Sequence, residues 1–371
     1  MSSRLSYVVF GAGNGGCAMA AELALLGREV ALVDYSEFAD RLAAIREAGG
    51  ITVDSRIDHF PGGRGIHFAR LPRVTTDTSL IAGADVLIVV VPGQHHDKVI
   101  RTALPYLRRG QLVLLNPGGV GGALVWGKAL AQAGVRGVLL AQPSDLLYAG
   151  SRSPSAKVLV NGKKKKAALG VFPNRDHAAV FEILADVFPE FEAAHNALVA
   201  GLGGPGMLVH PLPMLMNATR IDREAPFRYD AYDITRSIAR AIERLDAERT
   251  AIIAELGGQP TPIKDVLTEY YGVTGADFHE TVLKVPAYQG STAPPDFTHR
   301  YIAEEVPTHL VPSVEIARGL GLDAPVMVAT VTLAGAVTGN DFAREGWTAE
   351  RLGLAGLDRN GLLSLLEDGP D

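Results

Sequence analysis

Three glycines near the start of the chain limit what it can fold into more than any other feature does. Gly11, Gly13 and Gly16 form the pattern G-x-G-x-x-G in VVFGAGNGGC, between an apolar run typical of a strand and a run typical of a helix. In that setting the first glycine allows a tight turn, the second lets a pyrophosphate approach the backbone, and the third lets the helix pack closely on the strand. The pattern predicts that a dinucleotide contacts Gly11, Ala12, Gly13, Asn14, Gly15 and Gly16.

An acidic residue stands where a dinucleotide-binding fold places one. Asp34 closes the second apolar run, EVALVD, 18 residues after Gly16. A carboxylate at that position binds the ribose hydroxyls of NAD and repels the 2′-phosphate of NADP. The sequence therefore favours NAD(H) as the cofactor, without excluding NADP(H).

The first half of the chain alternates apolar runs with helix-like runs. Each apolar run is continuous, as expected for strands of a parallel sheet that is covered on both faces. Each helix-like run has a glycine near its end. Such alternation predicts a doubly wound α/β domain of the Rossmann type over residues 1–190. The expected strands are 7–10, 29–35, 85–91, 111–116 and 137–142, and the expected helices are 15–28, 37–50 and 121–134.

The region KVLVNGKKKKAALGVFP (residues 157–173) has Asn161 and Gly162 between two β-prone arms. This dipeptide is typical of a tight turn, so we expect a hairpin or an added pair of edge strands. The basic run Lys163–Lys166 follows it. We interpret the run as a solvated turn or strand edge and not as a phosphate-binding track, because the net charge of the chain is -6.

From about residue 190 the strand-like runs stop and helical spacing dominates. The segment 234–258 places its isoleucines and leucines on one helical face and ends in two glycines. Residues 310–322, 325–339 and 362–367 also have helical spacing. We expect a mostly α-helical second domain over residues 191–371, with the cleft between the two domains as the active site.

Composition narrows the class of protein further. With 371 residues, 47% hydrophobic and 20% charged, the chain can bury a large core. The apolar runs 84–93 and 326–337 are too short to span a bilayer. The single cysteine, Cys17, is interpreted as a buried packing residue and indicates a reducing compartment. We expect a cytoplasmic protein with no membrane or nucleic-acid partner.

Two further loops follow strand ends. Val91 and Pro92 come after the third strand-like run, and Asn116 after the fourth. Ligands of open α/β sheets lie outside the carboxyl ends of strands, so these residues are candidate walls of the nicotinamide pocket. His95 and His96 follow closely, but no third histidine or carboxylate stands nearby at metal spacing. We interpret both as ordinary loop residues and expect no metal site.

One histidine in the second half has the setting of an acid or base. His210 precedes Pro211 in MLVHPLPMLMNATR, an otherwise apolar stretch. An imidazole held by rigid backbone can transfer protons near neutral pH. A lone histidine is more often structural, so the spacing alone leaves both readings open.

Several segments together identify a family resemblance. The glycine turn, NPGGVGGAL, HPLPMLMNATR, DAERTAIIAELG, VPAYQG, RYIAEEVPTHLVP and DFAREGWTAERLGLAGL resemble the opine dehydrogenases of the octopine and nopaline type. The resemblance runs nearly end to end. It implies NADH-dependent reductive condensation of an α-keto acid with an amino acid or amine, the reverse oxidation, and a homodimer.

The resemblance also implies roles for individual residues. The histidine of the HP motif, here His210, works with a carboxylate on a later segment, which matches Glu305, where relatives carry Asp; Glu304 is the alternative. Substrate carboxylates need cationic anchors, for which the guanidinium fork is suited. Arg300 of the RY pair is the first candidate. The other expected substrate-binding residues are Asn217, Arg228 and Arg236.

Departures from the family pattern gather around the expected amine site. The chain has RYDAYDITRSI after PF, and Gln142 where a glutamate is expected. These changes point to a different amine partner, whereas the cofactor half stays close to the pattern. Two alternatives remain open: an NAD-dependent hydroxyacid dehydrogenase, which needs no amine, and a non-catalytic dinucleotide-binding sensor.

Overall fold

The computed structural model describes residues 5–153, 156–224, 233–289 and 294–370. The chain forms two compact units. The first comprises Met1–Gly118, Gly122–Ala197 and Leu365–Asp371, and the second comprises Gly119–Gly121 and Leu198–Ser364. These units differ from the predicted division into 1–190 and 191–371, because the first unit continues to Ala197 and takes in the C-terminal residues.

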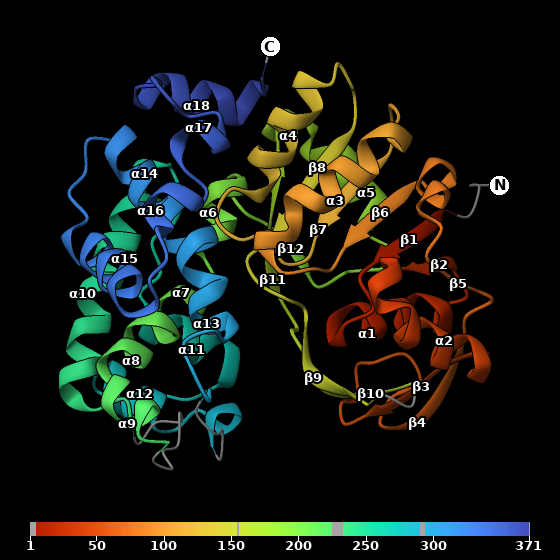
Figure 1. Cartoon of the computed structure of the whole chain (residues 1–371), viewed down its shortest axis with the longest axis horizontal. Coiled ribbons are helices and arrows are strands. Elements are labelled where there is room, and N and C mark those ends of the chain that lie inside the picture. The colour runs from red at the N-terminus through yellow and green to blue at the C-terminus, as the bar shows by residue number, and fades with distance from the viewer. Residues whose placement is uncertain (1–4, 154–155, 225–232, 290–293, 371) are drawn as a thin grey trace. The chain divides into compact units, whose positions relative to one another are not determined.

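The first unit is built on a twisted eight-stranded sheet (Figure 1). All of its strand pairs run parallel except β11 with β8. Strands β6 and β7 are buried along their whole length, as their continuous apolar runs predict. This confirms the doubly wound α/β class. The strand order is β12 (Phe191–Ala193), β11 (Ala167–Phe172), β8 (Leu139–Pro143), β7 (Leu112–Leu115), β6 (Val86–Val89), β1 (Ser6–Phe10), β2 (Glu29–Val33) and β5 (Arg73–Thr75).

The helices of the first unit include the three that the sequence indicates and two additional ones. The three are α1 (Asn14–Leu25), α2 (Ala39–Ala48) and α4 (Gly122–Gln132), and the additional ones are α3 (His96–Ala103) and α5 (His177–Leu184). The interpretation of His96 as a loop residue is wrong, because it begins α3 and is fully buried. Burial lowers the pKa of His96 to about 4. The side chain is therefore a neutral core residue beside Trp126, whereas His95 is exposed.

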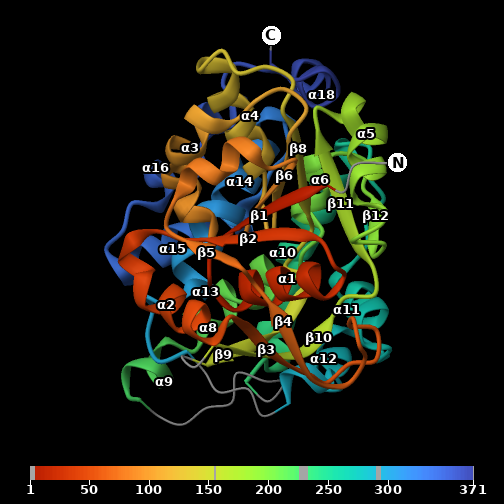
Figure 2. The same ribbon diagram turned by 90° about the vertical axis from the view of Figure 1, so that its right-hand side faces the viewer.

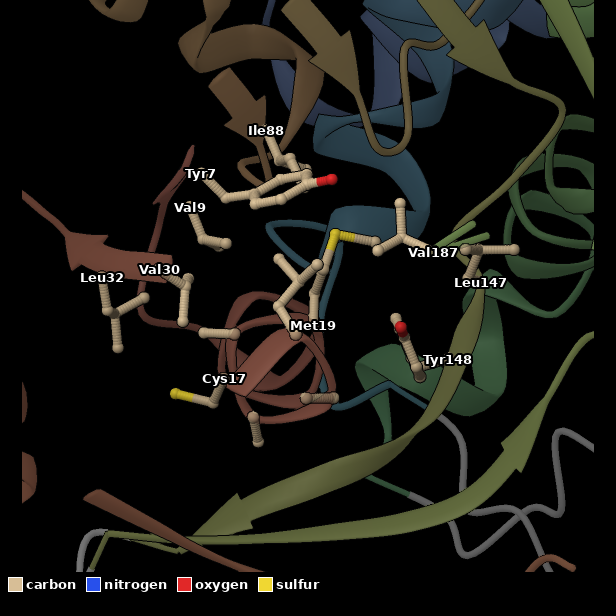
Figure 3. Close-up of a cluster of buried hydrophobic side chains, with 14 of the residues drawn as sticks. Tyr7, Val9, Cys17, Met19, Val30, Leu32, Ile88, Leu147, Tyr148 and Val187 are labelled. Carbon is tan, nitrogen blue, oxygen red and sulfur yellow. The ribbon is translucent and has the colours of Figure 1, made fainter. Parts of the chain in front are cut away.

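A second, four-stranded sheet belongs to the first unit and was not expected as such. Its order is β4 (Gly65–Arg70), β3 (Gly50–Ser55), β10 (Lys157–Lys163) and β9 (Tyr148–Ser153). Helix α1 packs between this sheet and the β1–β2 region (Figure 2). Figure 3 shows Cys17 and Met19 of α1 within the buried cluster that fills the space. The expected packing role of Cys17 agrees with its burial.

The dipeptide Asn161-Gly162 does not form the hairpin turn that its type suggests. Both residues lie inside β10, where the register with β9 shifts between Val160 and Gly162. The local sequence misleads here because β10 also pairs in parallel with β3, about a hundred residues earlier in the chain. The expected strand pair is wrong, because the two arms form β10 and β11, which belong to different sheets. The dipeptide instead marks a bulge where β10 pairs with β9.

The basic run is also only partly solvated. The side chain of Lys163 is 1% exposed, and its Nζ donates to Glu22 Oε1 at 2.7 Å and also to Glu190. Tyr148 donates its hydroxyl proton to the other oxygen of Glu22. A buried carboxylate on α1 requires a nearby cation, which Lys163 supplies. Lys166 remains exposed, as expected for the run as a whole.

Helices alone make up the secondary structure of the second unit in the part of the chain that the structure describes. The longest is α10 (Arg236–Glu255), which buries its predicted apolar face and begins where the Thr235 hydroxyl accepts from the Ile238 N–H. The others that matter below are α7 (Gly206–Val209), α8 (Pro211–Met216), α12 (Phe278–Val282), α13 (Arg300–Ala303), the π-helical turn η7 (Val306–Leu310), α14 (Val311–Gly319) and α15 (Pro325–Thr338).

One apolar stretch is longer than those that the sequence analysis considered. Ala197–Met216 has the length and composition of a membrane span, but 72% of it is buried inside the protein. It is also divided among α6 (Ala197–Leu202), α7 and α8. Such burial is typical of a core segment.

Candidate active site

The glycine turn joins β1 to α1, and its close contacts explain two of its glycines. Gly11 has φ +111°, and a Cβ there would lie 2.4 Å from the carbonyl oxygen of Val90. A Cβ on Gly16 would lie 1.8 Å from the carbonyl oxygen of Gly11. Both positions therefore exclude any side chain. The first glycine allows the turn to pass β6, and the last allows α1 to pack on the turn.

The middle of the turn is open. A Cβ on Gly13 would meet no atom within 4 Å, and Gly13 caps α1 without any side-chain hydrogen bond. The first N–H groups of α1 are thus not capped by a side chain, which is the arrangement that binds phosphate at a helix N-terminus. Gly15 faces Leu146, whereas Asn14 donates to the carbonyl of Gly150 at 3.4 Å. The turn fits a dinucleotide pyrophosphate.

Asp34 lies directly after β2 and is tied to the glycine turn. Its Oδ2 accepts from the Ala12 N–H at 2.7 Å, and its Oδ1 accepts from the Tyr35 N–H at 2.8 Å. Burial raises the pKa of Asp34, against the two N–H groups and Arg41, which act to lower it. The carboxylate therefore has a role in shaping the turn, besides the ribose contact that the sequence predicts.

The other expected cofactor residues follow the neighbouring strands. Val91 and Pro92 come after β6, and Asn116 comes after β7. The order β7-β6-β1-β2 places the turns after all four strands along one edge of the sheet, with the direction of winding changing between β6 and β1. Asn116 is fully buried, and its Oδ1 accepts no hydrogen bond from any described residue. This edge is where an open α/β sheet binds its ligand.

In the second unit the structure brings His210 and Glu305 together. His210 lies at the junction of α7 and α8, where Pro211 begins the new helix without an N–H to donate. Its Nδ1 hydrogen-bonds Glu305 Oε1 at 2.8 Å. The histidine side chain is 18% exposed and that of Glu305 is 4% exposed. A nearly buried carboxylate thus orients an imidazole that solvent can still reach.

Charges around Glu305 keep it ionised despite burial. Burial acts to raise the pKa of Glu305, but His309, the hydrogen bond from His210 and Arg300 outweigh it and hold the pKa at about 2. A carboxylate with this pKa stays negative throughout the working range of an enzyme. It can therefore stabilise an imidazolium at His210 as that group gains and loses a proton.

An aromatic ring fixes the other face of the imidazole. Tyr301 stacks on His210 with a centroid separation of 3.6 Å and an interplanar angle of 8°. His299 packs edge-on against Tyr301, and its side chain accepts from the Tyr301 N–H at the start of α13. The sequence analysis singled out the RY pair only for its arginine and missed this stacking residue.

The alternative carboxylate, Glu304, faces elsewhere. It is buried and accepts from Arg300 Nε at 3.0 Å, four residues earlier. The Arg300 side chain is about half exposed. Adjacent acidic residues thus have different partners, because successive positions of a helix face different directions.

Of the remaining expected substrate-binding residues, Asn217 and Arg236 bond to residues other than His210 and Glu305. Asn217 donates to the carbonyls of Pro213 and Asp233, which joins the end of α8 to the segment before α10. Arg236 is exposed and pairs with Asp277 and Glu280 near α12. Arg228 lies outside the described residues. Among those residues, no group of three or more His, Cys, Asp or Glu side chains is placed to hold a metal ion.

A glycine allows α7 to approach this pair. A Cβ on Gly206 would lie 2.6 Å from Glu305 Oε1, the oxygen that bonds His210. Gly206→Ala should therefore displace the carboxylate and lower kcat by about 10- to 100-fold, with NADH affinity unchanged. Steady-state kinetics and a fluorescence titration with NADH check this.

The matched control is Gly319→Ala in α14, where a Cβ would meet only ordinary contacts near 3.9 Å. It should leave kcat unchanged. Full activity in Gly206→Ala would show that the position of Glu305 does not matter to turnover.

Comparison with known proteins agrees with the two-part architecture. Residues 7–146 match the ketopantoate reductase PanE/ApbA family model, and residues 193–338 match the model described as NAD/NADP octopine/nopaline dehydrogenase, alpha-helical domain. A structure of octopine dehydrogenase with NADH and L-arginine superposes with a TM-score of 0.79 at 19% identity, covering 97% of this chain and 98% of that one. A yersinopine dehydrogenase structure with NADP+ bound gives 0.74 at 15% identity, covering 100% and 99%.

These matches define a Rossmann-type unit followed by a helical unit, and together with a full-length relative they define the class as an NAD(P)-dependent oxidoreductase. The chain is 34% identical over 363 residues to the opine dehydrogenase of Arthrobacter sp. (strain 1C), covering 98% of this chain and 99% of that protein. It is 23% identical to the protein ocs of Agrobacterium vitis, covering 80% and 82%. The chain belongs to the opine dehydrogenase family, as its sequence motifs suggest.

Proposed function

We propose that this enzyme joins an α-keto acid to an amino acid or other amine, with reduction by NADH, and catalyses the reverse oxidation. The observation that carries the proposal is the buried Glu305 carboxylate bonded at 2.8 Å to an imidazole that is stacked on Tyr301. A charged, oriented acid of this kind suits proton transfer to a departing hydroxyl. Simple binding of a dinucleotide needs no such pair.

The proposed reaction has three stages. The amine adds to the keto carbon, and His210 as imidazolium gives its proton to the resulting hydroxyl, which leaves as water. Glu305 stabilises the imidazolium and fixes its orientation. NADH, when bound, supplies the hydride that converts the imine carbon into a secondary amine. Arg300 is proposed to hold a substrate carboxylate, since its guanidinium is partly exposed beside Glu304.

The geometry of the first unit supports a set of cofactor-binding residues. The glycine turn and the N-terminus of α1 would hold the pyrophosphate, and Asp34 would bind the adenosine ribose of NADH in preference to that of NADPH. Val91, Pro92 and Asn116 would line the nicotinamide side. Asn116 supports this role because its buried Oδ1 accepts no hydrogen bond within the described chain.

The assay that tests the function measures NADH oxidation with pyruvate, glyoxylate, oxaloacetate or 2-oxoglutarate, each with and without neutral, basic and aromatic amines. Oxidation that requires both partners is the expected result. Oxidation with a keto acid alone would indicate a hydroxyacid dehydrogenase. NADH binding with no turnover across the panel would favour a non-catalytic sensor.

We also propose that the enzyme works in the cytoplasm as a homodimer. The single cysteine is in keeping with a reducing compartment, and the family resemblance favours a dimer formed through the helical unit. Sedimentation equilibrium tests this, with twice the 39.3 kDa chain mass as the expected value. A monomer at micromolar concentration would overturn the proposed assembly without affecting the reaction.

A further inference from the structure

A second histidine lies against the carboxylate that orients His210. The Nδ1 atom of His309 is 3.4 Å from Glu305 Oε2, the oxygen that does not bond His210. Oε2 is buried and accepts no hydrogen bond from the described residues, so the contact with His309 is an electrostatic one. The side chain of His309 is 15% exposed. Glu305 thus lies between two imidazoles, one at each oxygen.

The hydrogen bonds around His309 show which atom carries a proton. Its Nδ1 is 3.1 Å from the hydroxyl oxygen of Thr308, and that hydroxyl donates its own proton to the carbonyl of Glu304 at 2.6 Å. The Thr308 oxygen can therefore only accept from His309. In this arrangement Nδ1 is the protonated ring nitrogen and its N–H donates to Thr308, while Glu305 Oε2 lies 3.4 Å from the same nitrogen.

The backbone places His309 in this position through an unusual turn. Glu305 immediately precedes the π-helical turn η7, which contains Pro307, a residue without an N–H to donate to the helix. The carbonyls of Pro307 and Thr308 accept from the N–H groups of Trp347 and Val120. Short π-helical turns in a helix are often found at functional sites. These two backbone hydrogen bonds fix the turn that carries His309 beside Glu305.

We propose that His309 is a positioning residue for the reaction, whose Nδ1–H supports the second oxygen of Glu305 and so keeps the first aimed at His210. His309 does not itself touch substrate. A buried carboxylate with one unsupported oxygen can rotate toward any other donor, and its hydrogen bond to His210 would weaken. The inference rests on the proposed role of His210 and Glu305 in turnover.

Three variants at one position separate the donor from the packing. His309→Asn keeps an N–H where Nδ1 lies, His309→Leu keeps volume without a donor, and His309→Ala removes both. With the substrate pair found in the NADH oxidation assay, His309→Leu and His309→Ala should lower kcat by about 10- to 100-fold, with KM and NADH affinity unchanged. His309→Asn should restore most of the lost kcat. Equal activity in the Leu and Asn variants would overturn the proposal.

A spectroscopic measurement tests the same inference without any substrate. In protein with ¹⁵N-labelled histidine, the Nδ1–H proton of His210 should give a downfield resonance, which the His210→Ala spectrum assigns by its loss. That resonance should persist in His309→Asn, and should broaden or move upfield in His309→Leu. The charged or titratable neighbours His210, Arg300, Glu304, Tyr301 and His299 are the same in both variants.

A double variant shows whether His309 acts through His210. His210→Ala with His309→Leu should be no slower than His210→Ala alone. The hydrogen bond from His210 to Glu305, which His309 is proposed to support, is already absent in His210→Ala. Additive losses would overturn the proposal. Normal turnover in His210→Ala would instead refute the proposed role of His210, and the resonance in His309→Leu would still decide whether His309 supports Glu305.

Discussion

His210→Ala should lower kcat by about 10²- to 10⁴-fold and leave the affinity for NADH nearly unchanged. The imidazole is held by Glu305 at Nδ1 and by Tyr301 on its face, and it lies at the break between α7 and α8. Without it, loss of water from the amine adduct must proceed with solvent as the acid. Steady-state kinetics with both substrates and NADH titration check the two halves of this prediction.

A matched control is His279→Ala in α12, because this histidine belongs to the same unit and has no contact with Glu305 among the contacts of the described residues. It should retain full kcat. Loss of NADH affinity in His210→Ala, in proportion to the loss of rate, would mean that His210 contributes to cofactor binding and not to proton transfer. Unchanged turnover would remove it from the mechanism.

Asp34→Ala should weaken NADH binding by about 10- to 100-fold. Two effects combine in this variant. The ribose loses its carboxylate, and the N–H groups of Ala12 and Tyr35 lose buried acceptors, which loosens the glycine turn. NADPH should lose less affinity than NADH, because the repulsion of its 2′-phosphate is relieved at the same time. Fluorescence titration with both nucleotides measures the change.

Asp34→Asn separates the two effects. Its side-chain oxygen can still accept from one of the two N–H groups, but the charge is gone. Its NADH affinity should therefore lie between those of the native protein and Asp34→Ala, while its preference for NADH over NADPH falls. A native enzyme that binds NADPH more tightly than NADH would contradict the role given to Asp34.

The first unit was largely predictable because its signals are local. The runs before Gly11 and before Asp34 each form a strand, and the glycine pattern places the turn and α1 without any knowledge of distant residues. The second sheet depends on pairing between β3 and β10, far apart in the chain. No local pattern reports such a contact, and for this reason Gly162 suggested a turn where the chain has a bulge.

In the helical unit, too, some features could be predicted from the sequence and others could not. The family resemblance identified His210 and Glu305 as a catalytic pair, and the structure places them in contact. It also separates Glu305 from Glu304, which sequence alone cannot do because both are acidic and adjacent. His309 stands four residues after Glu305, a spacing that brings side chains together on a helix, and this signal went unused. Its relation to Glu305 depends on the π-helical turn at Pro307, which sequence analysis does not predict.

The most direct test of the central claim follows the hydride into the product. The enzyme is incubated with NADH carrying deuterium at C4 of the nicotinamide, a keto acid and an amine, and the products are analysed by mass spectrometry and NMR. The account predicts a secondary amine in which the former keto carbon carries one deuterium and is bonded to the amine nitrogen, with one water released. Deuterium found only in a 2-hydroxy acid, with the amine unchanged, would contradict it.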